Sequence, residues 1–264
     1  MSAPVRILSL GAGVQSSTLA LMIAAGDLPM VDGAIFADTQ WEPAHVYRWL
    51  DWLEKQLPFP VYRVTAGNIR ANVTAKQNTT GQRFASLPFH LVMPDGEKSM
   101  ARRQCTREYK ITPIRQQSRK LMLAAGAKAV EQWIGISTDE AQRMKPSGRQ
   151  YINNRWPLIE AGMSRRDCLA WMQARGYPQP PKSACIGCPF TDNARWRDMR
   201  DNDPESWADV VEVDRIIRKP VRGRRVAQFI HRDCVPLDQV DLRTAADHGQ
   251  ADLWGNECEG MCGV

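Results

Sequence analysis

Apolar residues along much of the chain follow two alternating patterns. Short apolar runs bounded by turn-forming residues predict buried strands at residues 5–10, 33–37, 61–65 and 129–137. Between these runs, apolar residues that share one helical face predict helices at residues 16–25, 43–57 and 112–125. A further helix is expected at residues 164–175, where Ser164 and Asp167 have the spacing of a capping box. Strands that alternate with helices predict an α/β fold, a doubly wound parallel sheet with helices on both faces.

The alternation breaks at two places. Residues 66–110 are polar and irregular, with a basic end, and predict no regular element. Near residue 190 the composition changes, and the remainder is rich in Arg, Asp and Trp. We therefore expect one domain over residues 1–190 and a mostly irregular and helical C-terminal extension over residues 191–264.

Length and composition limit the class of protein. The chain has 264 residues, 43% of them hydrophobic, which suffices for one large domain with an extension. The best candidate for a membrane span, residues 19–36, is interrupted by Asp27, Pro29 and Asp32. The N-terminus shows no charged segment followed by a cleavage site, so we expect a cytoplasmic protein that does not enter a membrane.

Charge and cysteine content narrow the chemistry. The net charge of +6 favours anionic partners, without choosing between nucleotides and nucleic acid. The seven cysteines are an odd number, and several are clustered. In a cytoplasmic chain, this pattern indicates metal or redox chemistry rather than disulfides. The sequence leaves the oligomeric state open between a monomer and a homodimer.

The segment after the first predicted strand has the sequence SLGAGVQSST at residues 9–18. Gly11 and Gly13 permit a tight backbone turn, and the helix that follows directs its unsatisfied N–H groups at that turn. Hydroxyl groups are contributed by Ser9, Ser16 and Ser17. These features predict an anion-binding loop at residues 9–17; the alternative is an ordinary connection between a strand and a helix. The segment matches neither the dinucleotide fingerprint nor the P-loop.

Five segments, in order over roughly residues 5–190, resemble the adenine-nucleotide alpha-hydrolase (PP-loop) superfamily and, within it, the phosphoadenosine phosphosulfate (PAPS/APS) reductase-like family. Residues 9–18 resemble the pyrophosphate-binding loop, and the Val-Gln step that contains Gln15 is similar to the variant of the sulfonucleotide reductases. The other segments are FADTQWEP (36–43), CTREYKITPI (105–114), WIGISTDE (133–140) and WPLI (156–159). The resemblance implies a PP-loop/HUP-like fold that binds an adenine nucleotide, namely PAPS, APS or ATP.

The expected nucleotide-binding residues lie in loops at the carboxyl ends of the strands. The first loop supplies Ser9, Gly11, Gly13, Gln15, Ser16 and Ser17. After the second strand, Asp38 and Thr39 are placed to contact ribose or base, with a helix cap as the alternative for Asp38. The fourth strand is followed by a further set: Gly135, Asp139, Glu140 and Arg143. Arg143 and Lys145 are expected to meet a phosphate or sulfate, or else to lie in a solvated loop. The family's Arg pair at this strand end is replaced by Ser137 and Thr138.

Three cysteines form a candidate metal site. Cys185 and Cys188 are the ends of a C-x-x-C turn, in which two thiolates can face one ion. Together with Cys105 they resemble the iron–sulfur ligands of the bacterial APS-reductase branch and of thiolating relatives, which implies a 4Fe–4S cluster. The family's tandem cysteine is here Cys105-Thr106, so the fourth iron is either open or bound by a cysteine of the tail. A structural zinc is the alternative, and a thioredoxin-like redox pair is less favoured because it lacks the βαβ context.

The tail has the sequence NECEGMCGV at residues 256–264. It is similar to the C-terminal segment of sulfonucleotide reductases, whose cysteine attacks the substrate sulfur, although no histidine follows here. Cys258 and Cys262 are therefore expected to act as nucleophile, cluster ligand or resolving thiol, with an uninvolved tail as the alternative. Elsewhere, Cys168 is expected in the core and His231 in a structural role.

Two basic segments are candidate anion sites. Lysine and arginine residues crowd around Cys105, where they would lower the pKa of the thiol and attract phosphates. The basic run at residues 215–225 predicts contact with a nucleic-acid backbone or, equally, a solvated face.

Three functions remain open from the sequence. The first is a sulfonucleotide-reductase-like enzyme of the oxidoreductase or sulfur-transfer type, in which a tail thiolate attacks sulfur and a thioredoxin-type reductant resolves the product. The second is ATP-dependent thiolation or another modification of a nucleic acid or nucleotide through an adenylated intermediate, with a separate sulfur donor. The third is a nucleotide or iron–sulfur sensor without catalysis.

Overall fold

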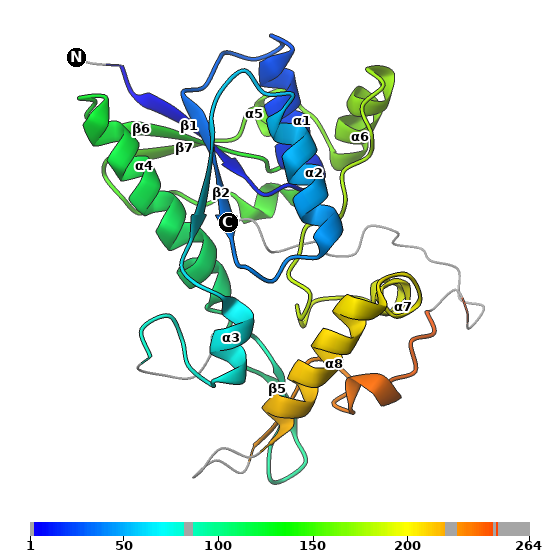
Figure 1. The fold of residues 1–264 in the computed structure, drawn as a ribbon. Helices are drawn as coiled ribbons and strands as arrows, with labels where there is room; N and C mark the ends of the chain where they lie inside the picture. The colour runs from blue at the N-terminus through cyan, green and yellow to red at the C-terminus, as the bar shows by residue number, and fades with distance from the viewer. Residues whose placement is uncertain (1–2, 82–86, 220–225, 245–246, 248–264) are drawn as a thin grey trace.

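A five-stranded parallel sheet forms the centre of the protein (Figure 1). The computed structural model describes residues 3–81, 87–219, 226–244 and 247. The strand order is β3-β2-β1-β6-β7, with every neighbouring pair parallel. The strands are β1 (Val5–Leu10), β2 (Gly33–Asp38), β3 (Val61–Thr65), β6 (Val130–Ile134) and β7 (Ile152–Arg155). The expected α/β fold with a doubly wound parallel sheet is confirmed.

Helices cover both faces of this sheet. One face carries α1 (Val14–Ala24), α2 (Ala44–Glu54) and α6 (Arg165–Ala174). The apolar stripe of α2 consists of Val46, Trp49, Leu50 and Leu53, all buried in the same core as Leu8 and Phe36 of the strands. On the other face, α4 (Thr112–Ala124) packs against β1, β2, β3 and β6. The short α5 (Pro157–Glu160) precedes α6.

A second, smaller core lies below the sheet in the view of Figure 1. Its helices are α3 (Ile69–Thr74), α7 (Asn193–Asn202) and α8 (Pro204–Arg218). An antiparallel sheet joins β4 (His90–Val92) to both β5 (Lys98–Met100) and β8 (Ala227–Phe229). Trp41, which follows β2, is buried among these helices and links the second core to the carboxyl edge of the parallel sheet.

The segment at residues 66–110 is therefore more regular than expected. It contains α3, β4 and β5, and ends in a π-helical turn, η1 (Thr106–Ile111), that continues into α4. The expectation of an irregular segment was wrong because β4 and β5 are only three residues long, and β4 gains its second partner from β8, far along the chain. Within the described residues, no helix combines the length and apolarity needed to cross a membrane.

Candidate functional site

The loop between β1 and α1 closes on itself through Ser16. The backbone N–H of Gly11 donates to Ser16 Oγ over 3.1 Å, and this hydroxyl donates to the carbonyl of Gly13 over 3.3 Å. Ala12 adopts a left-handed conformation at φ 57°, which tightens the turn. Ser17 points into the core, where its Oγ accepts from Trp49 Nε1 over 3.0 Å. Two of the three hydroxyls predicted for ligand binding, those of Ser16 and Ser17, thus hold the loop and α2 in place.

The exit of β6 packs directly against the start of α1. A Cβ atom built on Gly135 would lie 2.8 Å from the backbone N of Ser16, so no larger residue fits there without a shift. Gln15 Nε2 donates to Ser137 Oγ over 3.4 Å and to Glu140 Oε2 over 3.1 Å. The structure therefore brings Gln15 of the first loop close to Gly135 and Glu140, which follow β6.

Glu140, which accepts from Gln15, also contacts Arg143. The two side chains form an ion pair across the 3₁₀ turn η2 (Thr138–Arg143). Burial raises the pKa of Glu140, and the neighbouring Arg143 opposes that effect. Because both side chains are only 17% exposed, the charge of Arg143 is directed inward and not into bulk water.

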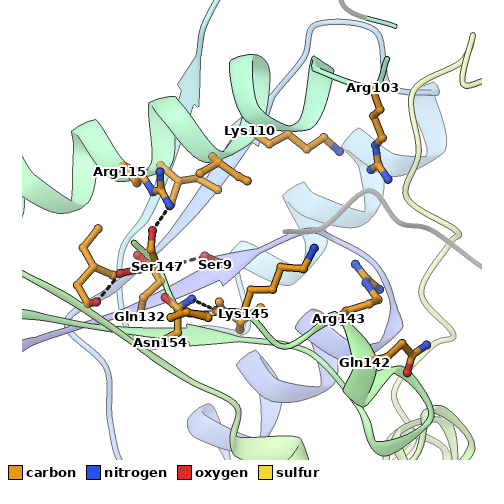
Figure 2. Close-up of a pocket in the computed structure, with 15 residues that line it drawn as sticks. Ser9, Arg103, Lys110, Arg115, Gln132, Gln142, Arg143, Lys145, Ser147 and Asn154 are labelled. Atoms are coloured by element: carbon orange, nitrogen blue, oxygen red, sulfur yellow. Dashed lines mark hydrogen bonds between the residues drawn. The ribbon is translucent and has the colours of Figure 1, made fainter. Parts of the chain in front are cut away.

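A pocket of about 450 Å³ opens beside this loop pair (Figure 2). Four isoleucines contribute apolar surface, namely Ile111, Ile114, Ile134 and Ile152. Polar side chains come from Ser9, Gln132, Gln142, Ser147 and Asn154, and positive charge from Arg103, Lys110, Arg115, Arg143 and Lys145. Among the described lining residues, none is acidic. An apolar floor with convergent cations suits a planar, anionic ligand.

The cationic head groups face a common space. In Figure 2, Lys110 of η1 and Arg103, which precedes η1, point into this space from one side. Arg143 and Lys145 point into it from the opposite side. Arg103 lies over the ring of Phe190, 5.4 Å from its centre, and its Nη2 is buried without a hydrogen-bond partner among the described residues. A buried donor of this kind costs free energy unless a ligand or water accepts from it.

Two contacts fix the loop that follows Arg143. Arg115 donates to the carbonyl of Ser147, and Asn154 Nδ2 donates to the carbonyl of Lys145 over 2.8 Å. Burial lowers the pKa of Arg115, and the positive charges of Arg149 and Arg107 lower it further. The pocket is therefore built with like charges close together, which favours an anion within it.

A second, smaller cavity adjoins the first. Its volume is about 30 Å³, the space of roughly one water molecule. The three predicted metal ligands all line it: Cys105, Cys185 and Cys188. Arg103 and Lys110 line both cavities, so these two cations stand between the larger pocket and the thiols.

Glu42 lies at the edge of the cysteine cavity and was not among the predicted site residues. Its side chain is only 1% exposed. Oε1 accepts from Thr39 Oγ1 over 3.2 Å and from Cys185 Sγ over 3.5 Å, and lies 3.6 Å from Lys110 Nζ. Oε2 has no hydrogen-bond partner within the described structure. Thr39 therefore faces the cysteines, 3.2 Å from Cys185 Sγ, and not the pocket of Figure 2.

The C-x-x-C turn is held by Trp41. The backbone N–H of Ile186 donates to the Trp41 carbonyl over 2.8 Å, and a Cβ on Gly187 would lie 2.1 Å from the indole ring. Trp41 Nε1 donates in turn to Asp209 of α8 over 2.6 Å. The second core thereby sets where Cys185 and Cys188 lie.

Cys105, Cys185 and Cys188 are the candidate ligands for a metal ion or cluster. Among the described residues, no three His, Cys, Asp or Glu side chains lie close enough together to hold one ion. The three thiols nevertheless line one cavity beside Arg103 and Lys110, whose charges complement a thiolate-bound group. At about 30 Å³, roughly the space of one water molecule, the cavity as described holds neither a cluster nor a metal ion, and the cluster stays a prediction.

Other predicted residues lie elsewhere. Asp38 Oδ1 accepts from the Gln40 N–H over 2.7 Å and from the Tyr47 hydroxyl over 2.8 Å, and burial with this contact raises the pKa of Tyr47. Asp139 Oδ1 accepts from the N–H of Arg165 at the start of α6, on the side away from the pocket. Cys258 and Cys262 lie outside the described residues, as do residues 220–225 of the basic run.

The described part of the basic run is partly neutralised. Arg218 Nε lies 3.0 Å from Asp214, and Arg215 lies 3.8 Å from Asp238. Cys168 is fully buried, and burial raises the pKa of its thiol to about 12, as expected for a core position. His231 is also buried and bonded to Asn193, in agreement with a structural role.

Several residues of the site were not predicted as such. Arg103 and Lys110 were expected near Cys105, but their place in the pocket of Figure 2 depends on the π-helical turn, which sequence periodicity does not reveal. Gln132 lies inside a strand, and its only signal was a polar residue in an apolar run. Glu42 stood within the FADTQWEP segment without a feature that marked it as buried.

Among known proteins, only the comparison with solved structures gives matches. No protein-family model matches the chain. No curated protein sequence matches it either. Among solved structures, the phosphoadenylyl-sulfate (PAPS) reductase from Candida auris in its phosphate complex is similar, with 13% identity and a TM-score of 0.38. The likeness covers 68% of this chain and 76% of that one.

Proposed function

We propose that the pocket of Figure 2 binds an adenine nucleotide and that the protein uses it in sulfur chemistry of the sulfonucleotide-reductase type. The observation that carries this proposal is the position of Arg103 and Lys110, which line both the pocket and the cysteine cavity. A nucleotide whose base lies on the isoleucine floor would direct an anionic group at these cations, and so toward the thiols.

The neighbouring loops support a nucleotide in this place. Ser9 at the end of β1 lines the pocket, and Gln15, Glu140 and Arg143 form one hydrogen-bonded chain beside it. The resemblance of residues 9–18 to a pyrophosphate-binding loop agrees with this arrangement. Asp38, Asp139 and Ser17 would act by shaping the loops, because each already bonds to a neighbouring residue.

The proposed reaction consumes the sulfur–oxygen bond of a sulfonucleotide. A thiolate of the tail, Cys258 or Cys262, attacks the sulfur, and the bond from sulfur to the phosphate oxygen breaks. The nucleotide leaves with the electron pair of that bond, and its negative charge is stabilised by Arg103 and Lys110. The resulting S-sulfonate on cysteine is then attacked by a dithiol reductant of the thioredoxin type, which releases sulfite and ends as a disulfide.

A cluster would be held by Cys105, Cys185 and Cys188, and would supply a polarising group next to the substrate. The role of this chain's own residues is to hold those thiols: Trp41 fixes the C-x-x-C turn, and Thr39 and Glu42 contact Cys185. Anaerobically purified protein is expected to contain iron and sulfide and to lose both in the Cys185→Ser variant. Zinc without iron would contradict the cluster and leave the nucleotide site untouched.

Nucleotide binding is tested by calorimetry with PAPS, APS and ATP. Arg143→Ala and Lys145→Ala are expected to weaken binding roughly tenfold to a hundredfold, the usual loss for a hydrogen bond to a charged group. Lys55→Ala, an exposed cation at the end of α2, serves as the matched control and should bind like the wild type. Equal binding by all the variants would contradict the assignment of the pocket.

The reaction is tested separately. Sulfite should appear from PAPS or APS with thioredoxin, and Cys258→Ser or Cys262→Ser should abolish it. Binding without sulfite from either compound would reject the reductase chemistry while the nucleotide site stands. Release of AMP and pyrophosphate from ATP would instead favour the adenylating alternative.

A further inference from the structure

Exposed arginines gather around the mouth of the pocket without lining it. We define the basic rim as Arg107, Arg119 and Arg149, all exposed. Arg107 lies on η1 and Arg119 on α4, where it is one turn beyond the pocket residue Arg115. Arg149 follows Ser147, whose carbonyl Arg115 binds, and the charges of Arg107 and Arg149 both act on Arg115. The three arginines therefore surround one half-buried cation at the pocket edge.

Several other exposed or half-buried arginines are paired with carboxylates, whereas exposed arginines such as Arg48, Arg166 and Arg232 have no ion pair within the described structure and lie apart from the rim in the sequence. Such pairs join Arg63 to Asp51 and Glu54, Arg155 to Glu160, Arg175 to Asp27, and Arg200 to Asp201. In the described part of the chain, no carboxylate lies within ion-pair distance of Arg107, Arg119 or Arg149. The rim thus keeps its positive charge concentrated at one place.

A mononucleotide in the pocket does not account for these charges. The pocket already has five cations of its own, and the rim side chains are not among its lining residues. A ligand that reaches the rim must extend beyond the pocket and repeat its negative charge along its length. A nucleic-acid backbone has this property, and arginine is suited to bind its phosphates.

We propose that the basic rim binds the phosphates of a single-stranded nucleic acid, so that the strand lies across the mouth of the pocket. A single strand is favoured over a duplex because it can present one unpaired nucleotide to a concave site. This surface differs from the basic run at residues 215–225, whose described arginines lie near carboxylates.

The test is fluorescence anisotropy with fluorescein-labelled single-stranded RNA and DNA of about 20 nucleotides. The wild type is expected to bind with an affinity that falls as salt increases, because counterions leave the phosphates on binding. The triple variant Arg107→Ala/Arg119→Ala/Arg149→Ala should bind at least tenfold more weakly near 0.1 M salt. Its slope of log affinity against log salt should be shallower by about 2, at about 0.7 per lost contact.

The controls separate this proposal from the nucleotide site. Arg200→Ala removes an exposed arginine that is paired with Asp201 and should leave strand binding unchanged. The triple variant should lose much less affinity for ATP and PAPS than for the strand, because Arg107 and Arg149 act on Arg115 from a distance and none of the three side chains lines the pocket. A preference for RNA or for DNA would identify which type of nucleic acid the rim binds.

Two results would overturn the proposal: no binding of either strand by the wild type, or an unchanged salt slope in the triple variant. Equal loss of strand and mononucleotide binding would also overturn it, since the arginines would then serve the pocket alone. Strand binding without any mononucleotide binding would support the rim and reject the proposed nucleotide pocket.

Discussion

Gly135 is the residue on which the contact between β6 and α1 depends most directly. Its Cα lies so close to the start of α1 that an added Cβ would meet the backbone N and Cα of Ser16 at 2.8 and 2.9 Å. These are backbone atoms, which cannot move aside as the end of a side chain can. The close approach also brings Gln15 within reach of Glu140.

Gly135→Ala is therefore expected to destabilise the fold by about 1–3 kcal/mol, the usual cost of overpacking a well-packed site. Gly11→Ala is the matched control, because its Cβ would meet Ser16 Oγ at an ordinary 3.5 Å. Urea denaturation of both variants measures the difference. Equal midpoints for the two variants would show that α1 and β6 are less tightly packed than described.

Residue types alone predicted the strand, turn and helix of the first loop, which the structure shows, whereas ligand binding by its residues stays a prediction. Gly11, Gly13 and Gln15 were expected at the first loop because a strand, a tight turn and a helix follow one another in the sequence. Glu42 was not, since a carboxylate beside a proline gives no sign of burial. Its environment is made by Lys110 and Cys185, which approach from distant parts of the chain.

At the scale of elements, His231 ties the end of β8 to α7. Nε2 lies 3.0 Å from Asn193 Oδ1, and Nδ1 accepts from the N–H of Asp233 over 3.2 Å. The accepting Nδ1 identifies the neutral ring as the form that this arrangement holds. Burial lowers the pKa of His231, and the nearby Asp233 opposes the effect.

A lowered pKa means that His231 contributes stability above the unfolded value of 6.5, and that this contribution is lost as the pH falls below it. The melting temperature should therefore drop between pH 7.5 and pH 5.5. His231→Gln should lower the melting temperature at pH 7.5, with a loss of about 1–3 kcal/mol, and reduce the pH dependence. Burial also lowers the pKa of His45 and His90, so His231→Gln should reduce the pH dependence without abolishing it. An unchanged pH dependence in His231→Gln would contradict this role.

Local periodicity predicted the helices that have a clear apolar face or a capping motif of their own. The apolar stripe of α2 and the capping box of α6 were both predicted from the sequence, and the structure confirms them. The three-residue strands β4, β5 and β8 carry too few residues for an alternating pattern. β4 and β5 pair locally, but the pairing of β4 with β8 joins segments more than 100 residues apart, as in His90 with Phe229.

At the scale of the molecule, two cores meet at the carboxyl edge of the parallel sheet. The alternation of strands and helices predicted the parallel sheet, and the location of the site at its carboxyl edge stays a prediction. The alternation did not predict that Trp41 would pack into the core formed by α3, α7 and α8. Nor did it predict that Trp41 would hold the C-x-x-C turn at the same edge. The juxtaposition of the pocket of Figure 2 and the thiols is a property of both cores together.

A second hollow of the molecule offers a direct comparison. A wide groove lies between α2 and α7 and is lined by, among others, His45, Trp52, Lys182 and Arg195. It also contains the carboxylates of Asp192 and Asp198, whereas the described lining of the Figure 2 pocket has none. Charge therefore favours the pocket of Figure 2 for an anionic nucleotide.

Photolabelling with 8-azido-ATP and 8-azido-adenosine 3′,5′-bisphosphate, followed by mass spectrometry of the digested protein, tests this central assignment most directly. We expect the label on peptides that line the pocket, around residues 111–115 or 142–154, and its loss when unmodified PAPS or ATP is added. Label confined to the groove between α2 and α7, at peptides around residues 45–52 or 179–198, would contradict the assignment.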